Sequence, residues 1–218
     1  EGGRIGDIYG TGYLRNDNGD FLINDNGQFI ADNNLQKIGN YNPDFTLGWN
    51  NNFSYKNWNM SFLFDWRQGG EIVSRTRALG NVGGQLAETA YRPEEGIIAQ
   101  GVNQTTGEPN TVAVSAESYY RQFYDRNHEE NNVYDASFLK LRQFAIGYDF
   151  QLKNGFLGLK EGADLSLSLI GNNLFVITEN PHFDPEQLAV QGNGFISGVE
   201  DMSYASTRSI GFKAGFNF

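Results

Sequence analysis

Two neighbouring acidic stretches are the part of this 218-residue chain where side-chain types and spacing could do chemistry. Asn16–Leu22 and Asn24–Ile30 form a near-repeat with a period of eight residues, and Asp17, Asp20 and Asp25 occupy polar positions in it. Carboxylates at alternating positions resemble part of a calcium-binding loop, although the bidentate Glu that closes an EF-hand loop is missing. The Asn-Gly pair in each stretch is a hairpin-turn signal, because both residues tolerate positive φ. The pattern favours turns, with a calcium site as the alternative.

The two histidines do not indicate a catalytic or metal centre. His128 lies in the polar stretch 125–130, and His182 lies in a Pro-rich stretch. A functional histidine needs a converging partner, which the sequence does not supply, so both histidines are expected to be solvated loop residues. The chain has no cysteine, which rules out disulfides and thiolate metal sites. No G-x-S-x-G, H-E-x-x-H or phosphate-binding glycine motif is present. We therefore predict a protein that is not an enzyme and that carries no cofactor.

The composition points to turn-rich β-structure. The chain contains 17 Phe, 11 Tyr and 27 Gly but only 5 Pro, a mixture typical of twisted strands and tight turns. A net charge of −10 argues against a nucleic-acid partner, which requires a basic surface. No run of 18 apolar residues exists, so a transmembrane helix is excluded. Membrane-spanning strands are still allowed, because they show only alternation.

Alternating apolar and polar residues predict about six strands. Residues at every second position from Trp58 to Trp66 share an apolar face, and the closing segment alternates in the same way up to Phe218. The apolar faces run about ten residues, the length that a tilted strand needs to cross a bilayer, whereas strands of soluble proteins are nearer five or six. The predicted strands lie near residues 5–15, 46–55, 57–67, 137–152, 163–173 and 206–218.

The connections between these strands alternate between long and short. Residues 16–45, 68–136 and 174–205 form long connections, whereas 56–57 and 153–162 are short. Outer-membrane barrels have long extracellular loops and short periplasmic turns. We therefore predict an all-β, antiparallel transmembrane barrel with a periplasmic C-terminus. Because about eight strands is the minimum for closure, these strands must belong to a larger barrel.

Position along the strands suggests further roles for particular side chains. Lys140 and Arg142 occupy the alternate positions of their strand that are predicted to face lipid. They lie near a strand end, where a charge is tolerated. Asp65 and Arg67 face inward and would line the lumen. The aromatic residues near strand ends that predict an interface girdle are Trp49, Tyr55, Trp58 and Trp66.

The long connection 68–136 contains a predicted helix. Ser115 is a suitable N-cap, and Tyr120, Phe123 and Tyr124 follow at helical spacing. One interpretation is that these rings pin the helix to neighbouring loops. The other is that they contact a partner protein or the face of a sugar, since Tyr combines an apolar ring with a polar tip.

Several motifs, taken together, resemble a known family. Their order and spacing are similar to those at the C-terminal end of SusC/RagA-type TonB-dependent outer-membrane transporters of Bacteroidota. The motifs are Leu35–Phe45, Asn52–Gly70, Ala136–Arg142, Ile146–Tyr148, Gly171–Phe175 and Arg208–Phe212. The resemblance implies a barrel of roughly 22 strands, with a plug domain and a TonB-contacting segment that lie outside these residues.

The resemblance also implies partners and a function. A SusD-like surface lipoprotein would cover the barrel, TonB would act through upstream regions, and outer-membrane lipid and lipopolysaccharide would surround it. Phe212, Phe216 and Phe218 in the closing strand resemble the signal that the barrel-assembly machinery reads. The implied function is uptake of a bulky nutrient, a glycan or a peptide. The alternatives are a secreted β-sandwich that binds glycans, and a barrel recruited to an export or assembly complex.

Overall fold

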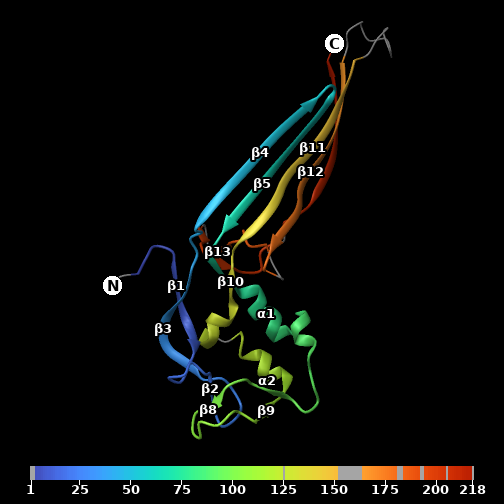
Figure 1. The fold of residues 1–218 in the computed structure, drawn as a ribbon. Helices are drawn as coiled ribbons and strands as arrows, with labels where there is room; N and C mark the ends of the chain where they lie inside the picture. Colours follow the sequence, from blue (N-terminus) through green and yellow to red (C-terminus); the bar gives the residue numbers. More distant parts are fainter. Residues whose placement is uncertain are drawn as a thin grey trace. The chain divides into compact units, whose positions relative to one another are not determined.

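The computed structural model describes residues 3–124, 126–151, 164–180, 184–191, 194–204 and 206–217. These residues fall into two compact units, which Figure 1 labels by their helices and strands. Unit 1 comprises Glu1–Asn42, Gly70–Ala136 and Asn180–Tyr204, and unit 2 comprises Pro43–Gly69, Ser137–Glu179 and Ala205–Phe218. Within the described ranges, no helix combines the length and the apolarity that a membrane span requires.

Unit 2 is a five-stranded antiparallel sheet with the strand order β16-β12-β11-β5-β4. Its strands are β4 (Phe45–Tyr55), β5 (Trp58–Gln68), β11 (Phe138–Gln151), β12 (Asp164–Thr178) and β16 (Ser209–Asn217). The long strands lie side by side in Figure 1. Tyr55 pairs with Trp58, so Lys56 and Asn57 form the predicted tight turn. Lys56 has a φ of 53°, in the left-handed region that a short hairpin loop requires.

Cross-strand register keeps one chemical character on each side of the sheet. We call the apolar face the side that carries Trp58, Met60, Phe62, Phe64, Trp66 and the residues in register with them. Phe62, for example, pairs with Phe144 of β11, and Leu169 of β12 pairs with Ile146 of β11 and Phe212 of β16. The polar face carries the residues between them, such as Ser61 and Asp65. The period-2 alternation is thus in register across the five strands, with Asn51 on the apolar face and Leu63 and Ile170 on the polar face as exceptions.

A β-bulge in β11 changes the side on which two charged residues lie. The register shifts between Leu141 and Gln143 against both neighbouring strands. Lys140 consequently pairs with Asp65 on the polar face and is only 3% exposed. The prediction that Lys140 and Arg142 lie on the lipid side is therefore wrong. A bulge adds one residue to a strand, and with a period of two this exchanges the two faces.

Unit 1 consists of short strands and helices formed by the long connections. Its elements are β1 (Asp7–Tyr13), β2 (Leu22–Ile23), β3 (Ala31–Asn40), β6 (Glu71–Ser74), α1 (Arg75–Gly83), η1 (Ala87–Ala90), β7 (Ile97–Ile98), β8 (Val102–Asn103), β9 (Ala113–Val114), α2 (Ala116–Arg121), η2 (Arg126–Asn132), β10 (Val133–Asp135), β13 (Ala189–Gln191), β14 (Gly194–Ile196) and β15 (Val199–Glu200). Residues 5–15 are thus not a strand of the five-stranded sheet, because β1 pairs with β3 instead. The stretch 16–45 is likewise not a simple loop, since it contains β3.

The eight-residue repeat closes on itself through backbone hydrogen bonds. The N–H of Leu14 donates to the carbonyl of Ile30 at 2.8 Å, that of Ile30 to Leu22 at 3.0 Å, and that of Leu22 to Leu14 at 2.9 Å. The aromatic residues directly before Leu14, Leu22 and Ile30 form one cluster, with ring centroids 4.9 to 5.7 Å apart; they are Tyr13, Phe21 and Phe29. This cluster forms part of the core of unit 1, together with the side chains of α2.

Some sequence predictions fall outside the described residues. They are the short connection 153–162, His182 and Phe218. His128 is described. It is 5% exposed, and its ring lies 4.7 Å from that of Tyr13, so it packs in the core of unit 1 and is not a solvated loop residue.

Candidate functional site

The four residues of the predicted girdle all lie on the apolar face, and all are exposed. The relative exposure is 56% for Trp49, 70% for Tyr55, 50% for Trp58 and 39% for Trp66. Tyr55 and Trp58 flank the tight turn, and the Trp58 ring meets Tyr148 edge-on at 4.9 Å. Trp66 lies at the other end of β5 and Trp49 nearer the middle of β4. Large aromatic side chains on an exposed sheet face mark a surface that contacts an apolar medium or a partner.

The length of the apolar face can be compared with the thickness of a bilayer. Trp58 and Trp66 are eight residues apart on β5, and the row containing Phe150 and Phe216 lies two residues beyond Trp58. Ten residues at about 3.4 Å span roughly 34 Å along the strand. With a tilt of about 40° this corresponds to roughly 26 Å along the membrane normal, close to the ~25 Å apolar band of outer-membrane barrels.

The closing strand β16 extends the apolar face to the edge of the sheet. Ile210 is 70% exposed, Phe212 is 68% exposed and Phe216 is 55% exposed. All three are in register with apolar residues or glycine of β12, Phe216 with Leu165 and Phe212 with Leu169. Two residues of the predicted assembly signal are thus exposed on an edge strand, and Phe218 lies outside the described residues. An exposed edge strand has backbone groups available for pairing with another strand.

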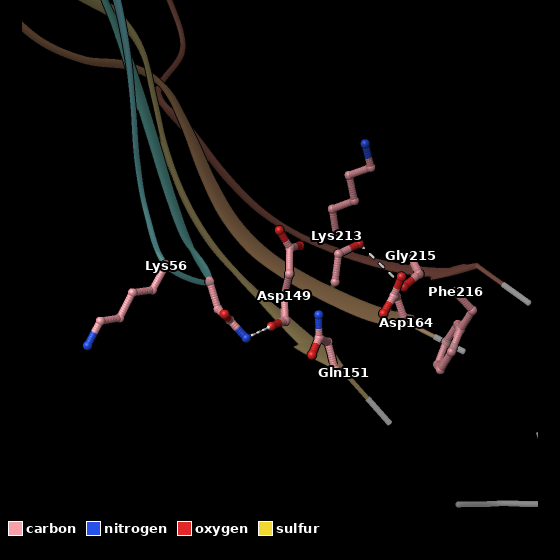
Figure 2. A pocket seen from close by; sticks show the side chains of 9 residues that line it. Lys56, Asp149, Gln151, Asp164, Lys213, Gly215 and Phe216 are labelled. Atoms are coloured by element: carbon pink, nitrogen blue, oxygen red, sulfur yellow. Dashed lines mark hydrogen bonds between the residues drawn. The ribbon is translucent and has the colours of Figure 1, made fainter. Parts of the chain in front are cut away.

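The polar face contains a hollow of about 540 Å³ near the tight turn, shown in Figure 2. Its wall is formed by Lys56, Asn57, Asp149, Gln151, Asp164, Ser166, Lys213, Gly215 and Phe216. The side chain of Asn57 donates to the carbonyl of Asp149 at 2.6 Å, and that of Asn59 donates to the Asp149 carboxylate at 2.6 Å. Two lysines and two aspartates give the wall charges of both signs. Such a surface suits polar groups of another protein segment or of a solute, and not an ion of one sign.

A second charged group lies further along the polar face, at the bulge. Nε and Nη2 of Arg142 donate to one carboxylate oxygen of Asp65, at 3.0 and 2.6 Å. Lys140 lies opposite Asp65 in the register. Asp65 is predicted from the sequence to face inward, and its pairing with Arg142 appears only in the structure. The sequence did contain a signal for the bulge. Lys140 and Arg142 are basic residues at alternate positions that continue as apolar residues further along the strand.

The acidic repeat forms turns. The side-chain oxygen of Asn16 accepts from the N–H of Asn18 at 3.0 Å, and the side-chain oxygen of Asn24 accepts from the N–H of Asn26 at 2.9 Å. These are Asx turns, which a glycine with positive φ completes in each repeat. The carboxylate of Asp25 accepts from Asn103 at 3.0 Å.

The three calcium candidates do not form a metal site in the described residues. Nowhere in that part of the chain do three acidic or histidine side chains gather in a group able to hold a metal ion. Asp20 accepts from the side chain of Asn16 at 3.1 Å, and Asp17 lies in the same exposed turn. The arrangement corresponds to the turn interpretation.

The helix near residue 115 begins where the sequence predicts. Ser115 caps α2, its hydroxyl accepting from the N–H of Ser118 at 3.2 Å. Tyr120 and Phe123 are each 9% exposed and pack within unit 1, so they are not available as partner contacts. Burial raises the pKa of Tyr120, whose hydroxyl lies 2.8 Å from the carbonyl of Glu88. Tyr124, at 47% exposure, is the one of the three that a partner could reach.

The sheet therefore has the construction of a wall in an outer-membrane barrel, with an aromatic-rich apolar face on one side and a polar face on the other. Comparison with known proteins agrees with this class.

No protein-family profile matches the chain. Relatives are found among the TonB-dependent receptors of Formosa agariphila. TonB-dependent receptor P3 is 30% identical over 183 residues, which cover 82% of this chain and 16% of the receptor. TonB-dependent receptor P39 is 29% identical over 213 residues, or 95% of this chain and 18% of the receptor.

Solved structures show the same fold. The RagAB peptide importer in its "closed-closed" state matches with a TM-score of 0.57 and 17% identity, covering 96% of this chain and 22% of that chain. The RagAB peptide transporter matches with a TM-score of 0.54 and 18% identity over the same shares. This chain spans about a fifth of the length of the proteins that it matches.

The chain is thus a distant homologue of part of the TonB-dependent receptors, and the resemblance inferred from its motifs is confirmed. This family consists of transporters and not of enzymes, so the prediction of a non-enzymatic protein is confirmed as well. The homology implies an outer-membrane location. The mostly-β fold matches part of a TonB-dependent barrel.

Proposed function

We propose that the five-stranded sheet is the wall of a TonB-dependent importer for a bulky nutrient, a glycan or a peptide. The observation that carries the proposal is the apolar face. It is long enough to cross the bilayer and bears exposed aromatic rings towards both ends, and the opposite face is polar. Upstream regions of the same polypeptide would supply the plug, the TonB-contacting segment and the strands that complete a barrel of roughly 22 strands.

The orientation of the wall follows from the lengths of its connections. The turn at Lys56 and Asn57 leaves one end of the sheet, and the long segment 70–136 connects the other ends of β5 and β11. Since outer-membrane barrels have short turns on the periplasmic side, we place unit 1 outside the cell and the C-terminus in the periplasm. Tyr55 and Trp58 would then lie at the periplasmic interface and Trp66 at the outer one, with Trp49 deeper in the bilayer, and outer-membrane lipid and lipopolysaccharide would contact the apolar face.

A SusD-like surface lipoprotein is the proposed partner of unit 1. Support comes from the match to the RagAB peptide importer, a two-component complex by its name. Tyr124 is the exposed residue of the predicted contact set. At the other side of the membrane, the barrel-assembly machinery would recognise the closing strand through Phe212, Phe216 and Phe218. Replacing Phe218 with Asp should lower the amount of assembled protein in outer membranes, whereas unchanged amounts would contradict this role.

The β-sandwich alternative is poorly supported, because a sandwich packs its apolar sheet faces against each other. Here the apolar face of the described residues exposes Trp49, Phe53, Leu169, Ile210 and Phe212, each more than half accessible. The export or assembly alternative has the same barrel wall and differs only in the direction in which the cargo moves and in the energy source for that movement. Transport measurements therefore separate it from import.

The test uses a host strain that lacks the full-length polypeptide and is complemented with the wild type. An epitope inserted at Thr105–Thr106, an exposed turn of unit 1, should be accessible to antibody on intact cells. Complementation should restore growth on one peptide or glycan source, and deletion of the TonB-contacting segment should abolish that growth. A polypeptide found outside the outer membrane, or growth that is independent of TonB, would overturn the proposal.

A further inference from the structure

The two turns of the eight-residue repeat contain the same reactive dipeptide. The sequence has four Asn-Gly pairs, and the structure describes both residues of two of them, Asn18-Gly19 and Asn26-Gly27. Asparagine is a thermally labile residue, and a following glycine has no Cβ to hinder the approach of its nitrogen to the asparagine side chain. The two pairs are therefore candidates for a covalent change that plays no part in the transport proposal.

The reaction exchanges a side-chain amide for a carboxylate. A base from the solvent removes the proton of the glycine N–H, and the nitrogen attacks Cγ of the asparagine. A C–N bond forms, the Cγ–Nδ2 bond breaks, and Nδ2 leaves as ammonia after taking up a proton from the solvent. Water then opens the cyclic imide at either carbonyl, which leaves aspartate or isoaspartate. The glycine N–H must first be released from its own hydrogen bond, since that bond holds the proton and fixes the direction of the nitrogen.

The closed turns hold both glycines in the same way. The N–H of Gly19 donates to the carbonyl of Asn16 at 3.0 Å, and the N–H of Gly27 donates to that of Asn24 at 2.9 Å. In both turns the asparagine side-chain oxygen also accepts from the backbone two and four residues later. Because neither glycine nitrogen is free while its turn is closed, the rate at each site follows the fraction of time for which that turn is open.

The first turn is held only by its own residues. Within the described part of the chain, the hydrogen bonds of residues 16–20 all join members of this segment, including the bond from the side chain of Asn16 to that of Asp20 at 3.1 Å. Residues 17–20 are exposed, and apart from its chain neighbours no atom lies within 4 Å of the position that a Cβ on Gly19 would take. Opening this turn therefore breaks no hydrogen bond to another segment.

The second turn is tied to the segment that contains β8. The two turns are joined by β2, which pairs with β8, and these two strands lie together in Figure 1. The carboxylate of Asp25, in the second turn, accepts from the side chains of Asn103 at 3.0 Å and Thr105 at 3.3 Å. Opening the second turn therefore disturbs side-chain hydrogen bonds that have no counterpart in the first.

Packing around Gly27 restrains the second turn further. Gly27 is buried, and a Cβ there would lie 2.8 Å from the carbonyl oxygen of Val112. The backbone N–H of Phe29, just after the turn, donates to the side chain of Gln122, the C-cap of α2, at 2.8 Å. The local motif is thus the same in both turns, and contacts with distant segments make the second turn harder to open.

We propose that Asn18 is a site of spontaneous deamidation in the folded protein, and that the contacts of the second turn protect Asn26 from the same reaction. The product places a further carboxylate beside Asp17 and Asp20 at an exposed tip of unit 1. The site lies within unit 1 and requires no ligand. It therefore stands or falls independently of whether unit 2 is the wall of an importer.

The test compares the two sites within one molecule. The purified full-length polypeptide in detergent is incubated at mildly alkaline pH and digested with trypsin at intervals. Trypsin releases residues 16–37 as one peptide, because no Lys or Arg lies between Arg15 and Lys37. Electron-transfer fragmentation of this peptide locates the change at position 18 or 26 and distinguishes isoaspartate from aspartate. Asn18 should deamidate at least about tenfold faster than Asn26, because the first turn opens more often.

The unfolded chain supplies the control for intrinsic reactivity. In denaturant the two sites should react at comparable rates, because both lie in the sequence Asn-Asp-Asn-Gly. Equal rates at the two sites in the folded protein, or no reaction at Asn18 under conditions in which the unfolded chain reacts, would overturn the proposal.

A double variant tests the source of the protection. Asn103→Ala combined with Gln122→Ala removes two tethers of the second turn and leaves the sequence around both sites unchanged. It should speed the reaction at Asn26 and leave that at Asn18 unaltered. Thr106→Ala, a change in the exposed loop after β8 that removes no bond to Asp25, should affect neither site. A reaction at Asn26 that is as slow in the double variant as in the wild type would overturn the proposed protection.

Discussion

Placing a charge on the apolar face should destabilise the protein according to its depth in the membrane. Phe62 lies midway between Trp58 and Trp66, about 14 Å from each along β5. With a tilt of about 40°, this places Phe62 roughly 10 Å from the Trp66 end of the apolar face and roughly 16 Å from the row of Phe150 and Phe216 at the other end, close to the bilayer midplane. Lysine at the midplane of an outer-membrane barrel costs about 2–4 kcal/mol, and near an interface about 0–1 kcal/mol. Phe62→Lys should therefore lower the folding equilibrium constant roughly 30-fold to several hundred-fold.

Loss of the ring must be separated from gain of the charge. Phe62 meets Trp49 edge-on at 5.3 Å and Phe64 at 5.4 Å, so truncation alone removes aromatic contacts. Phe62→Leu is the reference for that loss, and the depth-dependent penalty is the difference between Phe62→Lys and Phe62→Leu. The same pair of substitutions at Trp58, beside the tight turn, should differ by no more than about 1 kcal/mol.

The neighbouring residue Ser61 supplies the control for the two faces. It pairs with Asn52 and Ala145 on the polar face, so Ser61→Lys should change stability by no more than about 0.5 kcal/mol. The assay is denaturant unfolding of the full-length polypeptide in phospholipid vesicles, followed by tryptophan fluorescence. Equal effects of lysine at 61 and 62, or no difference between Phe62→Lys and Phe62→Leu, would refute the assignment of the apolar face to lipid.

Three further predictions concern single interactions. Arg142→Met should destabilise unit 2 by about 1 kcal/mol, because the pair with Asp65 is only partly exposed; a double-mutant cycle with Asp65→Asn in the same unfolding assay measures the coupling, and additive effects would deny it. Asp7 forms hydrogen bonds with Lys37, at 2.7 Å, and with Asn40, and these hold the pKa of Asp7 well below its usual value. The stability that ionised Asp7 contributes is therefore complete above about pH 4 and is lost as the pH falls through the lowered pKa. Lys37→Met should move the pKa of Asp7 upward in an NMR titration, and an unchanged pKa would contradict this cause. Asn24→Ala should destabilise unit 1 by about 1 kcal/mol equally with calcium and with a chelator, because Asn24 acts through its turn, and a calcium-dependent difference would favour the metal interpretation.

Local sequence patterns were enough to identify the strands of the sheet and their two faces. The alternation in 57–67 places Trp58, Phe62 and Trp66 together without reference to any other segment, because side chains of a strand point alternately to opposite sides. The turn at Lys56 and the cap at Ser115 are also local, since each depends on a few consecutive residues. The family resemblance rests on such local motifs in order along the chain.

Features that depend on the pairing of distant residues were not predicted from the sequence. The bulge at Arg142 exchanges the faces because one residue is added against both neighbouring strands, and the pairing with Asp65 joins positions 77 residues apart. The pairing of β1 with β3 outside the five-stranded sheet is a choice between partners that residues 5–15 alone do not encode.

The sequence by itself determined the five long strands of the sheet, the apolar face of each outside the bulge in β11, and the family that the chain resembles. Only the tertiary structure decided that Lys140 joins the polar face and that His128, Tyr120 and Phe123 are buried. The physical reason is range. Periodicity and capping act within a few residues, whereas burial and register depend on which distant segments pack together.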